Sequence, residues 1–498
     1  MFRNPIVPGF APDPSVVLFD GVFYLATSSF YLFPGVVIYA SIDLEDWTHI
    51  GNVINRSSQL SLRNATTTAM PLDDGNVMVA SGGLVAPTIR YNNGTFYIVC
   101  TNCYHEVDNW QIDNFFIHTK DIWSNTWSDP VYFPFYGVDP SLLFDDDGRV
   151  YAQGSWMIDR MKQPSCTIKQ FEIVTAQTVT EIDITSSKPI SGIQGPHIYK
   201  KDGWYYLLVA EGGTFEHHML SIARAKNVWG PYESCPHNPI MIADGTDEYV
   251  QNMGHGEIFQ DDDKTWHVLL ASTREDVSIA KNRIPKNKKI GAIHPHVGNL
   301  YLHHPPTLDP YKTPSVIELV PKSSSLSDPH GTALLTRRQR SLDTTATATL
   351  VLNDALPGIS AGLTVYKDPL RHASIGISIL TRVVSMHFVH KSKEYDVTAS
   401  QPHCIPTGVT KVHLRITASP DGYAFAFRYD GDGDDEEWSK VGEVDGAMMT
   451  ARDFTGADLG VFALRKDGGE QEVSQGAVFQ DFEFRDANEE ETVGDVSE

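Results

Sequence analysis

The sequence lacks a long apolar run, a regular set of cysteines and an excess of basic residues. No apolar stretch approaches the roughly 18–20 residues of a membrane-spanning helix, so we expect no integral membrane protein. Five cysteines in 498 residues, an odd number without regular spacing, predict no disulfide framework. Lys and Arg number 39 against 63 Asp and Glu, which gives a formal net charge of −24. That charge repels nucleic acid and anionic lipid, so neither is an expected partner, whereas a neutral sugar is compatible with it.

An apolar leader segment is also absent from the start of the sequence, which opens with MFRNP. The localisation stays open between the cytosol and a secreted protein whose leader was removed before this numbering begins. Turn and strand formers are abundant, with 38 Gly, 29 Pro and 10% aromatic residues. This composition is typical of many short strands joined by turns and argues against long helices.

Five segments repeat one pattern: an anchor dipeptide containing Pro or Gly, an apolar strand, a polar turn and an aromatic-rich strand. The anchors are Asp13-Pro14, Ala86-Pro87, Asp139-Pro140, Gly195-Pro196 and His255-Gly256. Consecutive anchors are 53–73 residues apart, which leaves room for one four-stranded sheet each. A radial array of such sheets is a β-propeller, so we predict five blades around one channel. An irregular all-β sandwich is the alternative, and the fivefold recurrence disfavours it.

The predicted fold class is therefore all-β, a five-bladed β-propeller followed by a C-terminal β-sandwich. We assign residues 1–300 to the propeller and 301–332, which are poor in periodicity and rich in Pro and Ser, to a connector. Residues 333–486 contain repeated period-two strands separated by polar turns, the pattern of a sandwich. Residues 487–498 are rich in Glu and poor in apolar groups, which predicts a disordered acidic tail.

Two of the five anchors carry a carboxylate in the same local sequence, Asp-Pro-Ser. A single Asp before Pro is more often a turn or cap residue than a functional one. Asp13 and Asp139, however, occupy equivalent places in two blades and should face one channel. Paired carboxylates flanking a bond perform glycoside hydrolysis; inverting enzymes hold them roughly 6.5–9.5 Å apart to admit a water molecule.

The motifs together resemble glycoside hydrolase family 43, the β-xylosidase and α-L-arabinofuranosidase group, particularly its fungal members. They are NPIVPGFAPDPSV, SSFYLFPGVVIYASIDLEDW, VDPSLLFDDDGRVY, GPHIYKKDGWYYLL, AEGGT, GTDEY and GHGEI. The resemblance implies inverting, exo-acting release of terminal β-D-xylose or α-L-arabinofuranose from xylo- or arabinoxylo-oligosaccharides, with no organic cofactor. It also implies that Asp13 is the general base and that Asp139 orients the general acid and tunes its pKa.

One departure from the family pattern falls on the general acid itself. The family has Glu in a Glu-Gly-Pro-His motif, whereas this chain has Gln194 before Gly195. A carboxamide nearly matches the shape of a carboxylic acid but has no acidic proton to donate. Because general acid–base catalysis is worth roughly 10²–10⁴-fold, we expect crippled hydrolysis. The explanations are an introduced Glu→Gln change or a natural pseudoenzyme, a non-catalytic carbohydrate-binding propeller.

Other positions carry over from the resemblance with defined roles. His255 matches a histidine at the centre of the propeller that in many relatives helps hold a cation such as Ca²⁺, partly through water. A hydrogen-bonded channel histidine without metal is the equal alternative. Phe30 and Phe33 match aromatic residues that line the pocket of the terminal sugar, and Thr214 and Arg90 match supporting residues. Arg90 has a structural alternative, which is an ion pair with a carboxylate of a blade.

Further departures affect the sugar-binding side. Val85 stands where relatives often have an aromatic residue, and Phe215 where many have His. The family's Gly-Arg-Glu-Thr segment, whose Arg binds the sugar, has no counterpart, and Arg274 and Arg283 are the nearest candidates. Glu211 in AEGGT matches a family position that coexists with the normal acid, so we expect it to be structural.

Overall fold

The computed structural model describes the chain from residue 5 to residue 486 with gaps. The residues left out within that range are 72–76, 107–108, 157–166, 176–177, 184–192, 215–216, 247, 249, 275–299, 303–315, 322–324, 329–331, 354–355, 357, 391–392, 398–402, 431–436, 450–451, 454 and 466–474. The predicted acidic tail, 487–498, lies outside the described residues. Among the described residues, no helix is long and apolar enough to cross a membrane.

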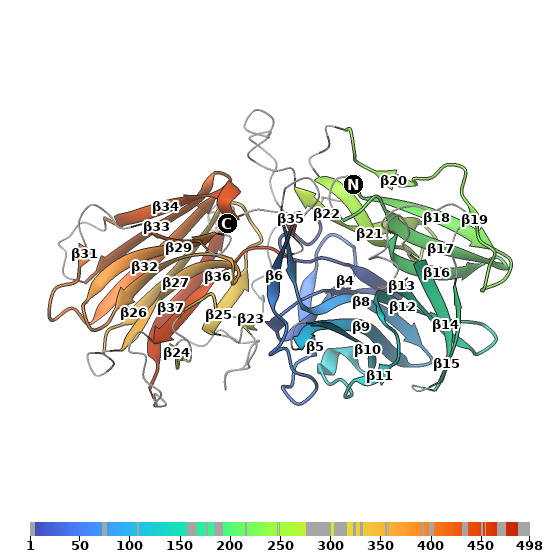
Figure 1. Cartoon of the computed structure of the whole chain (residues 1–498), viewed down its shortest axis with the longest axis horizontal. Coiled ribbons are helices and arrows are strands. Elements are labelled where there is room, and N and C mark those ends of the chain that lie inside the picture. Colours follow the sequence, from blue (N-terminus) through green and yellow to red (C-terminus); the bar gives the residue numbers. More distant parts are fainter. Residues whose placement is uncertain are drawn as a thin grey trace, which may run out of the picture.

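The N-terminal lobe is a ring of five antiparallel sheets (Figure 1). Its innermost strands are β1 (Ser15–Phe19), β8 (Gly83–Asn92), β12 (Gly137–Phe144), β16 (Gln194–Lys201) and β21 (Val250–Gln260). Each innermost strand contacts the next in this order, and β21 contacts both β16 and β1, which closes the ring. This closure confirms the five-bladed propeller, and each anchor lies within one of these strands or, in the case of Asp13-Pro14, immediately before it.

The remaining strands of each blade follow outward from the innermost one. In the first blade they are β2 (Val22–Thr27), β4 (Gly35–Ser41) and β5 (Thr48–Ile54), and in the second β9 (Thr95–Glu106), β10 (Asn109–Thr119) and β11 (Val131–Phe133). In the third they are β13 (Val150–Trp156), β14 (Thr167–Thr175) and β15 (Thr178–Asp183), and in the fourth β17 (Trp204–Glu211), β18 (Met219–Ala225), β19 (Glu233–Ser234) and β20 (Met241–Ile242). In the fifth blade, β22 (Trp266–Arg274) pairs with β21. A 3₁₀ turn, η1 (Ile122–Ser124), separates β10 from β11.

Two-residue turns close the first hairpins of three blades, as their sequences predict. Asp20-Gly21, Asn93-Gly94 and Asp202-Gly203 all have positive φ at both positions. The mirror-image turn that matches the right-handed twist of a hairpin requires this backbone conformation, and Asn, Asp and Gly tolerate it best.

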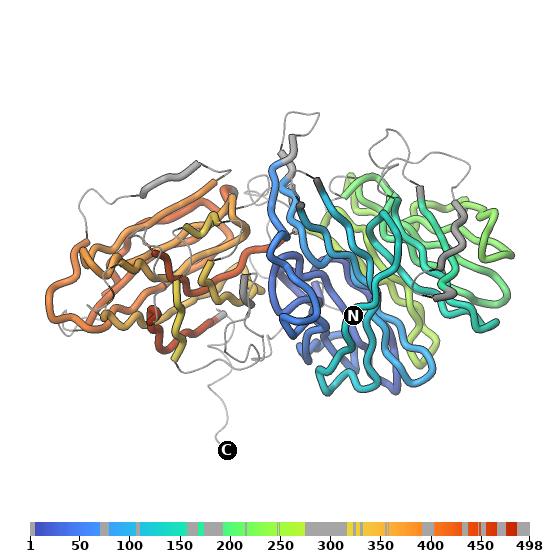
Figure 2. Tube along the Cα trace, turned by 60° about the horizontal axis from the view of Figure 1, so that its bottom comes forward, coloured from blue at the N-terminus to red at the C-terminus, as the bar shows by residue number. Residues whose placement is uncertain are grey.

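The C-terminal lobe packs two antiparallel sheets face to face (Figures 1 and 2). One contains β25 (Ala333–Arg338), β36 (Asp458–Arg465), β27 (Ile359–Asp368), β28 (Arg371–Ser378), β29 (Val383–His390), β30 (Lys393–Val397) and β31 (His403–Cys404). The other contains β37 (Ala477–Asp486), β26 (Thr344–Val351), β32 (Lys411–Ser419), β33 (Gly422–Tyr429) and β34 (Ser439–Asp445), and η2 (Gly446–Met449) follows it. Every second side chain of β32 is buried and those between are half-buried or exposed, so one face of this strand fills the core between the sheets.

The interval predicted as a connector differs from expectation because it supplies strands to both sheets of the sandwich. β23 (Leu300–Leu302) pairs with β25, and β24 (Val316–Leu319) pairs with β37. These two strands have three and four residues, too few for a periodic sequence pattern to reveal them.

Strand pairing and a shared core join the two lobes. β3 (Leu32–Phe33) of the propeller pairs with β23, and β35 (Arg452–Asp453) pairs with β7 (Val77–Ser81), which in turn pairs with β6 (Thr67–Pro71). One hydrophobic cluster contains Phe10, Phe30 and Tyr31 of the propeller together with Tyr366 and Phe462 of the sandwich. We call it the interlobe cluster. The sandwich therefore covers one side of the propeller.

Candidate active site at the propeller anchors

The five anchor residues share one unusual backbone conformation. Their φ angles are +53° at Asp13, +49° at Ala86, +57° at Asp139, +57° at Gly195 and +41° at His255. Left-handed backbone is uncommon for residues other than glycine, and such strain clusters at functional sites. The strand register shifts at the second to fifth anchors, which adds a bulge there. Bulges change the direction of side chains, so the repeat specifies a local geometry at the channel.

Asp13 and Asp139 have matching surroundings. Ser28 Oγ donates to Asp13 Oδ2 at 2.6 Å, and the backbone N–H of Ala86, the next anchor, lies 3.4 Å from the same oxygen. Asp139 Oδ2 accepts from Ser155 Oγ at 3.3 Å and from the N–H of Gly195, again the next anchor, at 3.2 Å.

The two bonds from backbone N–H groups link neighbouring blades. They also fix one oxygen of each carboxylate by hydrogen bonds to its charged form. The other oxygen of Asp13, Oδ1, lies 3.4 Å from His255 Nδ1.

Gln194 is buried, and its amide contacts two side chains. Its Nε2 lies 3.2 Å from Thr214 Oγ1 and 3.0 Å from His218 Nε2. His218 Nδ1 lies 3.3 Å from the carbonyl of Asn252, which can only accept, so its partners assign the hydrogen to Nδ1 and leave Nε2 to accept from the amide. Burial, with His255 nearby, lowers the pKa of His218 to about 4, so this ring is neutral at neutral pH.

A largely buried polar network involves the innermost strands that carry the anchors. Arg90 forms an ion pair of 2.6 Å with Glu257, and its guanidinium also contacts His197 Nδ1 at 3.0 Å. Glu257 accepts from Ser15 Oγ at 2.5 Å, which connects the fifth blade to the first. Burial and Arg90 lower the pKa of His197 well below its usual range. Arg90 therefore serves in the structure as the partner of a blade carboxylate.

His255 packs against the neighbouring anchor as well as against Asp13. A Cβ atom on Gly195 would lie 3.2 Å from the His255 ring, so glycine permits this close approach. The described residues contain no group of three or more His, Cys, Asp or Glu side chains that could hold a metal ion. A cation beside His255 would depend on water ligands, and Ca²⁺ stays a prediction here.

The remaining predicted site residues occupy different environments. Phe30 and Phe33 are only 3% and 5% exposed and belong to the interlobe cluster, where the Phe30 ring centroid lies 5.7 Å from that of Phe10. Their role as the wall of a sugar pocket stays a prediction. The Arg274 backbone lies in β22 opposite Val250, while its side chain, Phe215 and Arg283 fall outside the described residues.

Glu211 is buried and accepts from Ser221 Oγ at 2.9 Å. Burial raises the pKa of this carboxyl. Its hydrogen bond ties it to β18, within its own blade.

Three residues of the site escaped the sequence analysis. Ser28 directly follows β2 in ATSS, and Ser155 is the next-to-last residue of β13 in AQGS, so a Ser near the end of the second strand is the signal that the two Asp-Pro-Ser blades share. His218 has no such signal, because nothing in the sequence distinguishes it from the adjacent His217.

Comparison with known proteins gives consistent matches over both lobes. Residues 2–289 match the family described as glycosyl hydrolases family 43, and residues 282–485 match the β-xylosidase C-terminal concanavalin A-like domain. A xylosidase/arabinosidase 43B of Humicola insolens is 36% identical over 275 residues, 54% of this chain and 48% of that protein. The chain thus spans about half the length of the first curated relatives it matches.

Two other matches cover nearly the whole chain. A non-reducing end α-L-arabinofuranosidase of Bacteroides ovatus is 28% identical over 97% of this chain and 94% of that protein. The crystal structure of a xylan β-1,4-xylosidase from Bacillus halodurans superposes with a TM-score of 0.80 at 26% identity, over 97% of this chain and 99% of that one.

Proposed function

Because the chain belongs to glycoside hydrolase family 43, we propose that it derives from an exo-acting, inverting hydrolase of xylan-derived oligosaccharides. The sugars released would be terminal β-D-xylose, α-L-arabinofuranose or both, in line with the activities in the names of its relatives. The observation that carries the proposal is the matched pair of carboxylates. Asp13 and Asp139 occupy the anchors of equivalent innermost strands, have equivalent hydrogen bonds, and are each tied to the next anchor.

In the proposed reaction, Asp13 deprotonates the attacking water. Ser28 and Ala86 hold its Oδ2, which leaves Oδ1 as the oxygen to receive the proton. Residue 194 protonates the leaving oxygen on the other side of the bond, and water then replaces the leaving group with inversion. Asp139, bonded to the N–H that follows residue 194, orients that acid, and its negative charge raises the pKa of a carboxyl there.

Residue 194 is proposed to be Glu in the catalytically competent form. A Glu carboxyl in the same place would contact Thr214 and the neutral ring of His218. Its burial, like that of the amide at 5% exposure, disfavours the ionised form and keeps the proton available at neutral pH. Gln194 keeps these contacts but supplies no proton, so the chain should bind a glycoside and turn it over poorly.

Sugar contacts are assigned in the same proposal. Phe30 and Phe33 would form the apolar wall of the pocket, Thr214 and Arg274 would contact the sugar, and His255 would hold Asp13 or a hydrated cation. Apolar walls with a few polar groups are typical of sites for neutral ligands.

The decisive experiment is the substitution Gln194→Glu. We expect kcat on xylobiose or on an arabinofuranosyl xylo-oligosaccharide to rise by roughly 10²–10⁴-fold, because their alcohol leaving groups need the restored general acid, whereas nitrophenyl glycosides, whose leaving group is stable without a proton, should gain less. The ratio of the two rates gives the sugar preference, and NMR of the first-formed anomer tests inversion. Adding Asp13→Asn to Gln194→Glu should abolish the gain. Retained sugar binding without any gain in rate would instead support a non-catalytic binding propeller.

A further inference from the structure

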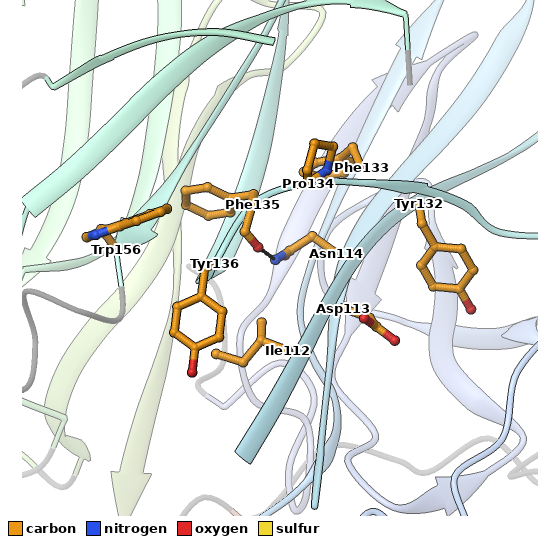
Figure 3. Close-up of a pocket in the computed structure, with 9 residues that line it drawn as sticks. All are labelled: Ile112, Asp113, Asn114, Tyr132, Phe133, Pro134, Phe135, Tyr136 and Trp156. Carbon is orange, nitrogen blue, oxygen red and sulfur yellow. Dashed lines mark hydrogen bonds between the residues drawn. The ribbon is translucent and has the colours of Figure 1, made fainter. Parts of the chain in front are cut away.

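A cleft of about 410 Å³ lies between the second and third blades. Its lining includes Ile112, Asp113, Tyr132, Phe135, Tyr136 and Trp156 (Figure 3). In the figure, Tyr132 lies on one side of Ile112 and Asp113, while Tyr136 and Trp156 lie on the other. We call it the Tyr132–Tyr136 cleft.

The cleft presents aromatic surface to solvent. Tyr132 is 47% exposed and Tyr136 is 44% exposed; no other tyrosine among the described residues is as exposed as these two. Large apolar side chains that are exposed together mark binding sites more often than singly scattered ones do. Both exposed tyrosines line the same cleft, which makes the cleft a candidate binding site.

The floor of the cleft is held rigidly. Asn114 Nδ2 donates to the carbonyls of Phe135 and Gly137, each at 2.8 Å, which fixes the segment that enters the third blade. The Phe135 ring lies against Gly137 and Gly154, where a Cβ atom would come within 2.4–2.5 Å of it. Preorganised surfaces of this kind lose little entropy when a ligand binds.

The cleft lies at the same end of the third blade as the candidate active site. Trp156 pairs with Gly137, two residues before Asp139, and the neighbouring Ser155 donates to the Asp139 carboxylate. A chain held in the cleft would therefore lie on the face of the propeller where the anchors begin.

We propose that the Tyr132–Tyr136 cleft is a second carbohydrate-binding site, which takes the neutral pentose units of a xylan-type chain. The inference rests on the proposed function for its choice of sugar. Aromatic rings offer flat apolar faces to the C–H groups of a pyranose, and tyrosine hydroxyls and the Asp113 carboxylate offer partners for its hydroxyls. No Lys or Arg belongs to the lining, and the net charge of −24 disfavours a polyanion.

Two contacts define what each side chain contributes. Asp113 Oδ2 already accepts from Tyr104 at 3.0 Å, which orients the carboxylate. Lys169 Nζ lies 3.9 Å from the centroid of the Trp156 ring and occupies one of its faces. The exposed tyrosines, rather than Trp156, are therefore the main stacking surfaces.

The test uses the chain as it stands, because Gln194 allows binding without rapid hydrolysis. Calorimetric titration with xylohexaose should give a Kd that rises about fivefold on Tyr136→Ala, the loss expected for one aromatic contact. Tyr132→Ala should act similarly. The Kd for xylose should not change in either variant. Trp266→Ala, which removes an aromatic side chain of similar exposure (48%) on the fifth blade, is the matched control.

An unchanged Kd for xylohexaose in both tyrosine variants would overturn the proposal, as would an equal loss for xylose and xylohexaose. If no xylose binds but Tyr136→Ala still weakens xylohexaose, the cleft stands and the proposed central site fails. Two ligands share this chemistry, the distal part of a substrate held in the central site and a separate xylan chain. The length of the oligosaccharide distinguishes them. A loss that grows from xylotriose to xylohexaose indicates the distal part of the substrate, whereas an equal loss for xylotriose and xylohexaose, with xylose unaffected, indicates a separate chain.

Discussion

At the scale of single residues, the charged groups of the propeller fall into two kinds. Asp13 and Asp139 stay partly accessible and are held through one oxygen, whereas Glu257 is buried and fully engaged. The side chains of Arg90 and Glu257 are only 15% and 2% exposed, so their charges compensate each other away from water. A buried pair of this type adds little net stability, but removing one partner leaves an isolated charge.

The first residue-scale prediction concerns this pair. Glu257→Gln should lower the free energy of unfolding by about 3–5 kcal/mol, because the Arg90 guanidinium would keep its charge without a carboxylate. Urea unfolding at pH 7 measures the change. Asp129→Asn is the control, since Asp129 pairs with Arg56 at the surface, where loss of an ion pair costs about 1 kcal/mol or less. Equal effects of the two substitutions would contradict the assignment of a structural role to Arg90.

At the scale of elements, the position of a residue along a β-strand sets whether its side chain is buried or exposed to water. β28 is buried along almost its whole length and includes a histidine, His372, that is 3% exposed. Its Nε2 lies 2.9 Å from Ser327 Oγ, and its ring stacks on Tyr366 with centroids 5.9 Å apart. Burial, with His387 nearby, lowers the pKa of His372 to about 3.

The burial of His372 in this strand predicts that the free energy of unfolding depends on pH. Because the folded-state pKa is depressed, the neutral ring stabilises the fold fully above the unfolded pKa of about 6.5, and this contribution is lost as the pH falls towards 3. Between pH 7 and pH 5 the loss from His372 alone is about 2 kcal/mol. His372→Phe, which keeps the aromatic ring, should reduce the fall in unfolding free energy by that amount. Urea unfolding at both pH values measures it, with the exposed histidine substitution His118→Gln as the control. An unaltered pH slope in His372→Phe would contradict the argument.

At the scale of the whole molecule, part of the propeller's hydrophobic core is covered by the sandwich rather than by its own strands. Phe10, Phe30 and Tyr31 are 2–3% exposed because Tyr366 and Phe462 of the sandwich cover them. Tyr31 also donates a hydrogen bond from its hydroxyl to the carbonyl of Lys367. The sandwich therefore completes the core formed by residues that are close in sequence to Ser28 and Asp13.

Truncation tests this dependence. Deleting residues 333–498 should leave an aggregating propeller with little activity even in the Gln194→Glu background, since the interlobe cluster would face water. Sedimentation velocity and the nitrophenyl glycoside assay measure the two effects against the full chain carrying Gln194→Glu. A monomeric, fully active fragment would show that the sandwich has no part in forming the site.

The ring of blades, the sandwich and the five anchors could all be predicted from the amino-acid sequence. These follow from local repetition: anchor, apolar strand, polar turn and aromatic strand recur five times, with Asn-Gly or Asp-Gly in four of the turns, and each unit can bury its faces only against its neighbours. The same repetition singled out Asp13 and Asp139, and the motif around Gln194 led to the proposal that residue 194 is Glu in the competent form.

Contacts between residues far apart in the sequence, in contrast, became known only from the folded chain. The contact between Gln194 and His218, the ion pair of Arg90 with Glu257, and the pairing of β3 with β23 join segments whose sequences carry no sign of one another. The Tyr132–Tyr136 cleft likewise exists only because two blades stand side by side. Periodicity specifies the strands, but partners across a channel or an interface are set by how the blades and lobes pack, which depends on the whole chain at once.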